Sequence, residues 1–227
     1  MEWFITNLES QTPFAYARFN DGEMMGIDQV HSIVARGDQV VDKSLSDALR
    51  EALSYKQKNY YVGVPCSLCY PHYAKLALEI VGDYEFVTSA VDTTNRNWKK
   101  FMDTFPTLMK DRRLIWVGGA DQKVDPLKNM GLNVANQVRV PHKNSWKFYE
   151  PISREVPSLF KEGDVVGISL GPTARVLVRK WFEAYPDVTF IDLGSNLDPY
   201  TRGVKHNCHL GWEETGFNLT TRCAECN

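Results

Sequence analysis

Hydrophobic positions along the chain alternate between two patterns. Short, nearly continuous apolar runs are separated by longer segments in which apolar residues recur every three or four positions. The first pattern is typical of strands buried on both faces of a sheet, and the second of helices that pack one face against it. The alternation therefore predicts an α/β fold, with a mostly parallel sheet and helices on both faces.

The two patterns also predict how the chain is divided. Strands are expected at 14–19, 60–65, 85–90, 113–119, 134–141, 164–170 and 188–194, and helices at 44–57, 67–81, 95–105, 145–156 and 172–185. From residue 201 onward, turn-forming residues replace both patterns. We therefore expect one domain over 1–200 and a C-terminal tail, 201–227, that must be held to this domain because it cannot build a core of its own.

Composition and charge narrow the class of protein. Of the 227 residues, 43% are hydrophobic and 24% charged, which is typical of a soluble globular protein. The formal net charge of -2 lacks the basic excess of a nucleic-acid binder, so no nucleic-acid partner is expected. No apolar run approaches the ~20 residues of a transmembrane helix, and the first residues lack the basic start of a secretion signal. These features predict a cytoplasmic protein without a transmembrane segment.

The string RFNDGEMMG, 18–26, carries the first candidate site. It follows the strand predicted at 14–19 and places Asp21 and Glu23 on either side of Gly22. Two carboxylates at the carboxyl end of a parallel strand can bind a hard cation such as Mg²⁺ or Mn²⁺. The same residue types are also common in turns and helix caps, so the spacing alone leaves both interpretations open.

Three further strand ends carry groups suited to a phosphate. Gly171, Pro172 and Thr173 begin a predicted helix, whose first N–H groups can bind an anion or merely start the helix. Lys143 and Asn144 can hold a phosphate and a hydroxyl, or form a solvated turn. The remaining candidates for a diphosphate are two arginines, Arg18 and Arg96, although Arg96 can equally lie on a helix surface.

Four of the five cysteines form two CxxC pairs, Cys66 with Cys69 and Cys223 with Cys226. Two such pairs are typical of a tetrahedral zinc site, each pair supplying two thiolates. The pairs lie too far apart in sequence for a compact zinc ribbon, so we predict a structural Zn²⁺ that holds the tail to the domain. Disulfides and unbound thiols are the alternatives. Cys208 and His209 are spare donors, for which a buried thiol and a surface histidine are the simpler interpretation.

In this order, the strings ARFNDGE, RVPHKNSWKFYEPI, GISLGPTARVL and FIDLGSNLDPY resemble the GT-D type glycosyltransferases over roughly residues 13–200. The resemblance implies a Rossmann-like sheet and a hexosyltransferase-like enzyme of polysaccharide biosynthesis. Such an enzyme transfers sugar from a nucleotide diphosphate sugar to a glycan or glycoconjugate acceptor. The resemblance also implies that Asp21 and Glu23 bind the divalent cation, and that Asp192 is the aspartate at the end of the strand in the family's last motif. The chain departs from the family at Ser195, where a histidine is expected.

The residues are consistent with this chemistry. A cation on the acidic pair stabilises the charge that grows on a departing diphosphate, and a base must take the proton of the acceptor hydroxyl. Asp192, Asp198 and Asp92 all lie at predicted strand ends, and the sequence does not rank them as the base. A metal-dependent phosphoesterase or nucleotide-sugar hydrolase, and a non-catalytic sugar-nucleotide-binding module, are the alternative functions.

Overall fold

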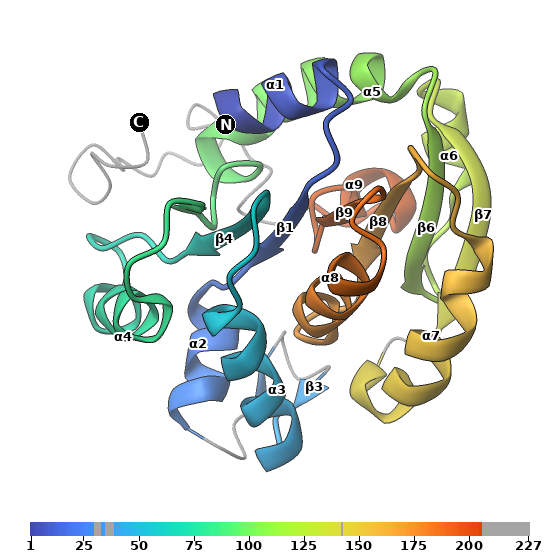
Figure 1. Cartoon of the computed structure of the whole chain (residues 1–227). Helices are drawn as coiled ribbons and strands as arrows, with labels where there is room; N and C mark the ends of the chain where they lie inside the picture. Colours follow the sequence, from blue (N-terminus) through green and yellow to red (C-terminus); the bar gives the residue numbers. More distant parts are fainter. Residues whose placement is uncertain (30–32, 35–38, 142, 206–227) are drawn as a thin grey trace.

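The structure, a computed structural model, describes residues 1–29, 33–34, 39–141 and 143–205. Seven parallel strands form one sheet in the order β5-β4-β1-β9-β8-β6-β7 (Figure 1). These strands are β1 (Ala15–Arg18), β4 (Tyr60–Val64), β5 (Val87–Ser89), β6 (Arg113–Gly119), β7 (Asn133–Val140), β8 (Val165–Ser169) and β9 (Thr189–Asp192). All seven predicted strands are confirmed, and the sheet is parallel throughout. A small antiparallel pair, β2 (Ile33–Val34) with β3 (Gln39–Val40), was not predicted.

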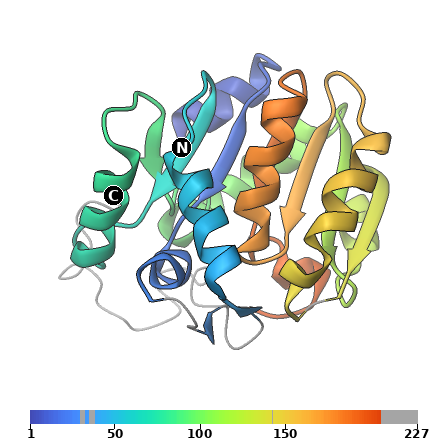
Figure 2. The same ribbon diagram turned by 60° about the horizontal axis from the view of Figure 1, so that its bottom comes forward.

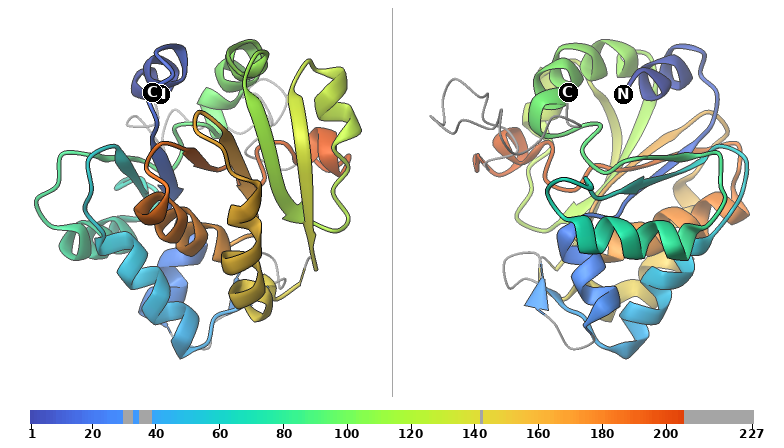
Figure 3. Two further views of the ribbon diagram at one scale, coloured as in Figure 1. Left: turned by 45° about the vertical axis from the view of Figure 1, so that its right-hand side comes forward. Right: turned by 90° about the vertical axis from the view of Figure 1, so that its left-hand side faces the viewer.

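Helices cover both faces of the sheet, as the strand pattern predicts (Figure 3). They are α1 (Glu2–Glu9), α2 (Asp21–Asp28), α3 (Lys43–Ser54), α4 (Pro71–Val81), α5 (Trp98–Met109), α6 (Asp125–Asn129), α7 (Tyr149–Glu155), α8 (Thr173–Ala184) and α9 (Asp198–Thr201). Short 3-10 helices cover Asn95–Asn97, Ser145–Phe148 and Val156–Leu159. Each of the five predicted helical segments contains a helix, whereas α1, α2, α6 and α9 were not predicted.

Side chains alternate between two cores, one on each side of the sheet. In β1, Ala15 and Ala17 face the core beneath α3 and α8, whereas Tyr16 faces the core beneath α1 and α5. This follows from the two-residue period of a strand. The small alanines let α8 approach β1 closely, and the larger ring of Tyr16 fills the other side. Both faces of the central strands are therefore buried, which explains their continuous apolar sequence.

Helix α1 is short because its apolar pattern is only two turns long. Phe4 and Leu8 lie one turn apart and are 1% exposed each, packed with Phe101 and Phe105 of α5. The packing of this face, not the intrinsic propensity of eight residues, stabilises the helix. Within the described residues, every helix is too short or too polar to cross a lipid bilayer.

Candidate functional site

A cleft of ≈ 580 Å³ lies where the parallel strands end, and we call it the strand-end cleft. Segments after β1, β5, β6, β8 and β9 line it, within 18–23, 90–95, 119–122, 169–171 and 194–198. Figure 2 shows this edge turned toward the viewer, with the carboxyl ends of the strands side by side. On one side of β1 lies β4, the next strand of this sheet along the chain, and on the other side lie β9 and β8. Such a change of direction leaves an open crevice in α/β sheets, where ligands bind.

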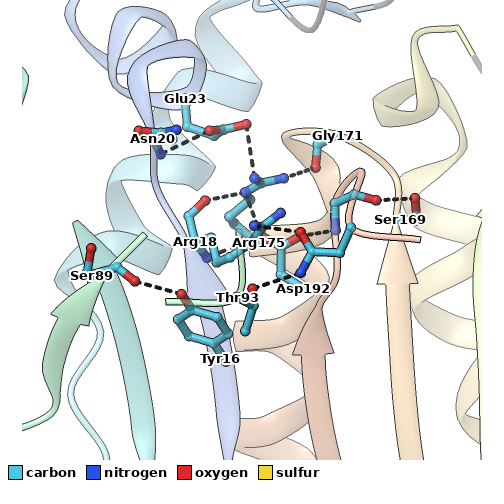
Figure 4. Close-up of polar contacts among 12 residues, drawn as sticks. Tyr16, Arg18, Asn20, Glu23, Ser89, Thr93, Ser169, Gly171, Arg175 and Asp192 are labelled. Atoms are coloured by element: carbon cyan, nitrogen blue, oxygen red, sulfur yellow. Dashed lines mark hydrogen bonds and ion pairs between the residues drawn. The ribbon is translucent and has the colours of Figure 1, made fainter. Parts of the chain in front are cut away.

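Arg175 of α8 lines the strand-end cleft and contacts four segments of the chain (Figure 4). Its guanidinium contacts the Asp192 carboxylate at 2.9 Å and the Glu23 carboxylate at 3.3 Å. It also donates hydrogen bonds to the backbone carbonyl oxygens of Arg18, at 2.6 Å, and Gly171, at 2.5 Å. Arg175 is 5% exposed, so these contacts are made almost without water. The geometry fixes the ends of β1, β8 and β9 and the start of α2 relative to one another.

Asp192 is fully buried at the end of β9, and its charge is balanced from two sides. Its carboxylate accepts hydrogen bonds from the backbone N–H groups of Arg18 and Gly194, and the Arg18 Nε lies 3.7 Å away. Gly194 has a positive φ of 49°, and a Cβ there would lie 2.0 Å from the Arg18 Nη2. Only a glycine therefore lets the Arg18 guanidinium occupy this part of the cleft.

The acidic motif begins α2, where Asn20 is the N-cap and Glu23 is the third helical residue. The Glu23 carboxylate accepts from the Asn20 N–H at 3.1 Å, and the Asn20 side chain is placed toward the Glu23 backbone N–H as in a capping box. This reciprocal capping box is encoded by the Asn-x-x-Glu spacing. Burial raises the pKa of Glu23 more than the nearby Arg175 lowers it. Glu23 is thus a buried group that positions Arg175 and the helix start.

Asp21, by contrast, is exposed at the first position of α2 and lines the strand-end cleft. The Tyr70 hydroxyl donates to the Asp21 carboxylate, and burial together with this carboxylate raises the pKa of Tyr70. Because positions two apart on a helix point in different directions, Asp21 and Glu23 do not converge on one point.

Whether a divalent cation can bind here depends on the different surroundings of Asp21 and Glu23. One Glu23 oxygen faces Arg175 and the other accepts from Asn20, and the described residues contain no cluster of three metal-ligating side chains. The carboxylates therefore do not form a protein-only cage. Asp21 alone would suit a Mg²⁺ or Mn²⁺ if a ligand supplied phosphate oxygens as well, because these ions commonly bind through one or two carboxylates plus substrate phosphates.

The three predicted base candidates differ in their surroundings. Asp92 accepts from the Trp3 indole at 2.7 Å and from Thr88, and lies 3.3 Å from the N-terminal amino group. It therefore anchors the start of the chain, and Asp192 holds the two arginines described above. Asp198 lines the cleft, with its carboxylate 3.2 Å from the Gln122 amide and 3.5 Å from the Arg202 guanidinium.

Several predicted ligand-binding residues lie outside the cleft lining. Asn144 accepts the Val40 N–H at 3.0 Å and so holds β3, and Lys143 beside it is exposed. Thr173 is fully buried and contacts the Ser145 hydroxyl at 2.9 Å, and Pro172 is also buried. Of the Gly171–Thr173 string, only Gly171 lines the cleft. These positions pack the loops that surround the cleft. The side chain of Arg96 lies outside what the structure describes.

The sequence missed polar residues that the fold brings to the cleft. Gln122 donates to the Ser169 hydroxyl at 2.8 Å and to Asp198, and its own Oε1 accepts from the Gly119 N–H. Arg175 lies within the predicted helix 172–185, two residues after Thr173, and the sequence analysis gave it no role. Their position in the sequence could have identified Gln122 and Ser169 as cleft residues, because both occur at or shortly after the ends of predicted strands.

The first CxxC pair lies in a turn between β4 and α4. The sequence predicts a helix over 67–81, directly after Cys66, but the start of this prediction is wrong because Pro71 is the first residue of α4. The Tyr70 N–H donates to the Cys66 carbonyl at 2.9 Å, which closes one turn around the pair. Cys208, His209, Cys223 and Cys226 lie outside the described residues.

Comparison with known proteins gives matches only at the level of structure. No family model matches the chain, and no curated protein sequence matches it. A structure described as a new glycosyltransferase from Streptococcus sanguinis, of domain of unknown function 1792, has a TM-score of 0.68 and 18% identity, over 90% of this chain and 84% of its own. A second structure of that domain, described as a distinct glycosyltransferase fold, has a TM-score of 0.66 and 18% identity, over 89% and 82% of the two chains.

A selenomethionine-substituted structure of the same domain has a TM-score of 0.67, with the same identity and coverage as the second. At 18% identity these similarities establish the fold, which is a glycosyltransferase fold. The resemblance to GT-D type glycosyltransferases is thereby confirmed at the level of the fold.

Proposed function

We propose that this protein is a metal-dependent glycosyltransferase that transfers a sugar from a nucleotide diphosphate sugar to a hydroxyl group of a glycan or glycoconjugate. The observation that supports this proposal is the strand-end cleft. It lies in a glycosyltransferase fold, and Arg18, Asp21 and Asp198 all line it. Arg18 is 6% exposed, and its Nε makes no hydrogen bond within the described residues. Its Nη1 donates to Asn196 at 3.2 Å, and because Arg18 lines the cleft, the outer N–H groups of its guanidinium can also donate to a phosphate oxygen.

Charge balance supports the need for a divalent cation. Three arginines and three carboxylates line the cleft: Arg18, Arg175, Arg202, Asp21, Glu23 and Asp198. A lining with equal numbers of positive and negative side chains offers little net attraction to a dianionic diphosphate. A Mg²⁺ or Mn²⁺ on Asp21 would supply the missing positive charge and act as a Lewis acid toward the phosphate oxygens.

Asp198 is the general base in this proposal. It takes the proton of the acceptor hydroxyl while that oxygen forms a bond to the anomeric carbon. The bond from that carbon to the diphosphate oxygen breaks, and the electron pair leaves with the diphosphate. Arg18 stabilises the resulting charge, while Gln122 and Arg202 hold the Asp198 carboxylate in place.

Ligand binding is tested by thermal shift with nucleoside diphosphates, with and without Mn²⁺. A ligand at a hundred times its Kd stabilises by about 2.7 kcal/mol, or about 5–11 °C for a domain of this size. We expect Asp21→Asn to abolish the Mn²⁺-dependent part of the shift. Asp28→Asn, at the other end of α2, is the matched control and should keep it. An equal shift in Asp21→Asn would exclude the metal assignment.

Catalysis is tested with Asp198→Asn. We expect kcat to fall by about 10²–10⁴-fold while the donor-induced thermal shift is retained, since a base acts on the acceptor proton. Asp121→Asn removes the other carboxylate that contacts Arg202, at 2.8 Å, and should leave most of the activity. Wild-type activity in Asp198→Asn contradicts its role. Release of free sugar at the same rate with and without acceptors would instead identify a hydrolase.

A further inference from the structure

Asn196 lies in the turn that follows β9 and is fully buried. The backbone of this turn is fixed at two points. The Asn196 N–H donates to the Leu193 carbonyl at 2.9 Å, and the Asn196 carbonyl accepts from the Trp98 indole at 2.9 Å. Asparagine side chains in turns commonly bond to the backbone of their own turn. The side chain of Asn196 instead reaches two segments that are distant in the sequence.

The amide of Asn196 joins Arg18 to the loop after β5. Its Oδ1 accepts from the Arg18 Nη1 at 3.2 Å, and its Nδ2 donates to the Thr93 hydroxyl at 2.8 Å. A guanidinium can only donate, so the amide atom that faces Arg18 must be the oxygen. The amide nitrogen then faces Thr93, which is 1% exposed and whose hydroxyl can accept. The two partners therefore determine how the amide is oriented.

The Arg18 guanidinium is held differently by each of its neighbours. Its Nε lies 3.7 Å from the Asp192 carboxylate, which is too long for a hydrogen bond. Asp192 therefore balances the charge of Arg18 without fixing the direction of its N–H groups. Asn196 does fix this direction, because a hydrogen bond weakens steeply as its angle departs from a straight line. On the remaining side, the Nη2 lies under Gly194, where only a glycine leaves room for it.

The neutral charge of the Asn196 amide matters as much as its position. The strand-end cleft is lined by equal numbers of arginines and carboxylates, so its attraction for a diphosphate is already small. A carboxylate at position 196 would add a second negative partner to Arg18. An amide orients the guanidinium and leaves its positive charge available to an anionic ligand.

We infer that Asn196 is a positioning residue, which directs the N–H groups of Arg18 toward the diphosphate of the ligand, and that Thr93 holds the Asn196 amide in place. The identity of the ligand as a nucleoside diphosphate rests on the proposed function. Because Asn196 is fully buried, it acts through Arg18 and not by its own contact with the ligand.

Binding of UDP, GDP, ADP and CDP, each with Mn²⁺, to the full-length protein tests this inference by isothermal titration. For the nucleotide that binds the wild-type protein, we expect Asn196→Ala to raise the Kd about tenfold, because it removes a hydrogen bond to a charged group. In an Arg18→Met background, the same substitution should change the Kd less than about twofold, because no guanidinium remains to be positioned. Asn97→Ala is the matched control. Asn97 donates to the Val91 carbonyl at 3.3 Å and so holds the same loop, and its loss should leave the Kd within about twofold.

A milder pair of variants covers the case in which Asn196→Ala does not fold, which circular dichroism and urea denaturation detect. Thr93→Val keeps the shape of the side chain and removes the hydroxyl that accepts from Asn196, so it should raise the Kd several-fold. Thr93→Ser keeps a hydroxyl and should restore most of the affinity. Unchanged binding in folded Asn196→Ala or Thr93→Val, or equal losses with and without Arg18, would overturn the inference alone. A wild-type protein that binds none of the four nucleotides would overturn the proposed function, and this inference with it.

Discussion

Arg175 provides the most direct test of how the cleft is held together. Its replacement by methionine keeps most of the side-chain volume and removes the charge. The substitution leaves the Glu23 carboxylate without its cation and leaves Asp192 with Arg18 alone. It also leaves the carbonyl oxygens of Arg18 and Gly171 without the hydrogen bonds that Arg175 donates. Glu23, Asp192 and Arg18 are buried, so water cannot readily replace the contacts that they lose.

The expected cost follows from burial. Removing one partner of a buried ion pair costs about 3–5 kcal/mol, because the remaining charge stays buried without compensation. For a domain of this size, that corresponds to a fall in Tm of about 6–20 °C. Arg179, one turn further along α8, supplies the comparison. It contacts Glu51 at 2.8 Å, but that carboxylate is 62% exposed, so the pair contributes about 0.2–1 kcal/mol.

Urea denaturation of Arg175→Met, Arg179→Met and the wild-type protein measures the difference. We expect the free energy of unfolding to fall much further for Arg175→Met, with an unchanged m-value. Equal losses in the two variants, or a loss below about 1 kcal/mol in Arg175→Met, would refute the argument that burial determines the strength of this network.

Two other predictions address the same part of the cleft. Gly194→Ala should destabilise the protein and weaken nucleoside diphosphate binding, because the added Cβ would displace Arg18. Gly203 also has a positive φ, but a Cβ there would meet no atom within 4 Å, so Gly203→Ala should leave binding unchanged. Thermal shift with a nucleoside diphosphate measures both effects. Burial raises the pKa of Glu23 above its ordinary 4.5, so its contribution to stability is fully present below pH 4.5 and lost as pH rises through the raised pKa. Glu23→Gln should remove this fall from the urea-derived stability profile, and parallel profiles for the two proteins would contradict the assignment.

The sequence determined the elements of the fold because their signals are local. Continuous apolar runs identified all seven strands of the main sheet, and the three-to-four-residue period identified α3, α4, α5, α7 and α8. The spacing of Asn20 and Glu23 already contained the capping box that starts α2. Short helices such as α1 were missed because two turns carry too little periodicity, and packing against α5 stabilises them instead.

Only the tertiary structure decided which polar residues share the strand-end cleft. Arg175 donates to the backbone of Arg18, which lies 157 positions earlier, because strand order places β9 between β1 and β8. Periodicity shows that a strand exists but not which strand lies beside it. For the same reason the sequence could not separate Asp198 from Asp92 and Asp192, because all three lie at or shortly after the ends of predicted strands. Their roles differ because their neighbours differ, and those neighbours come from distant parts of the chain.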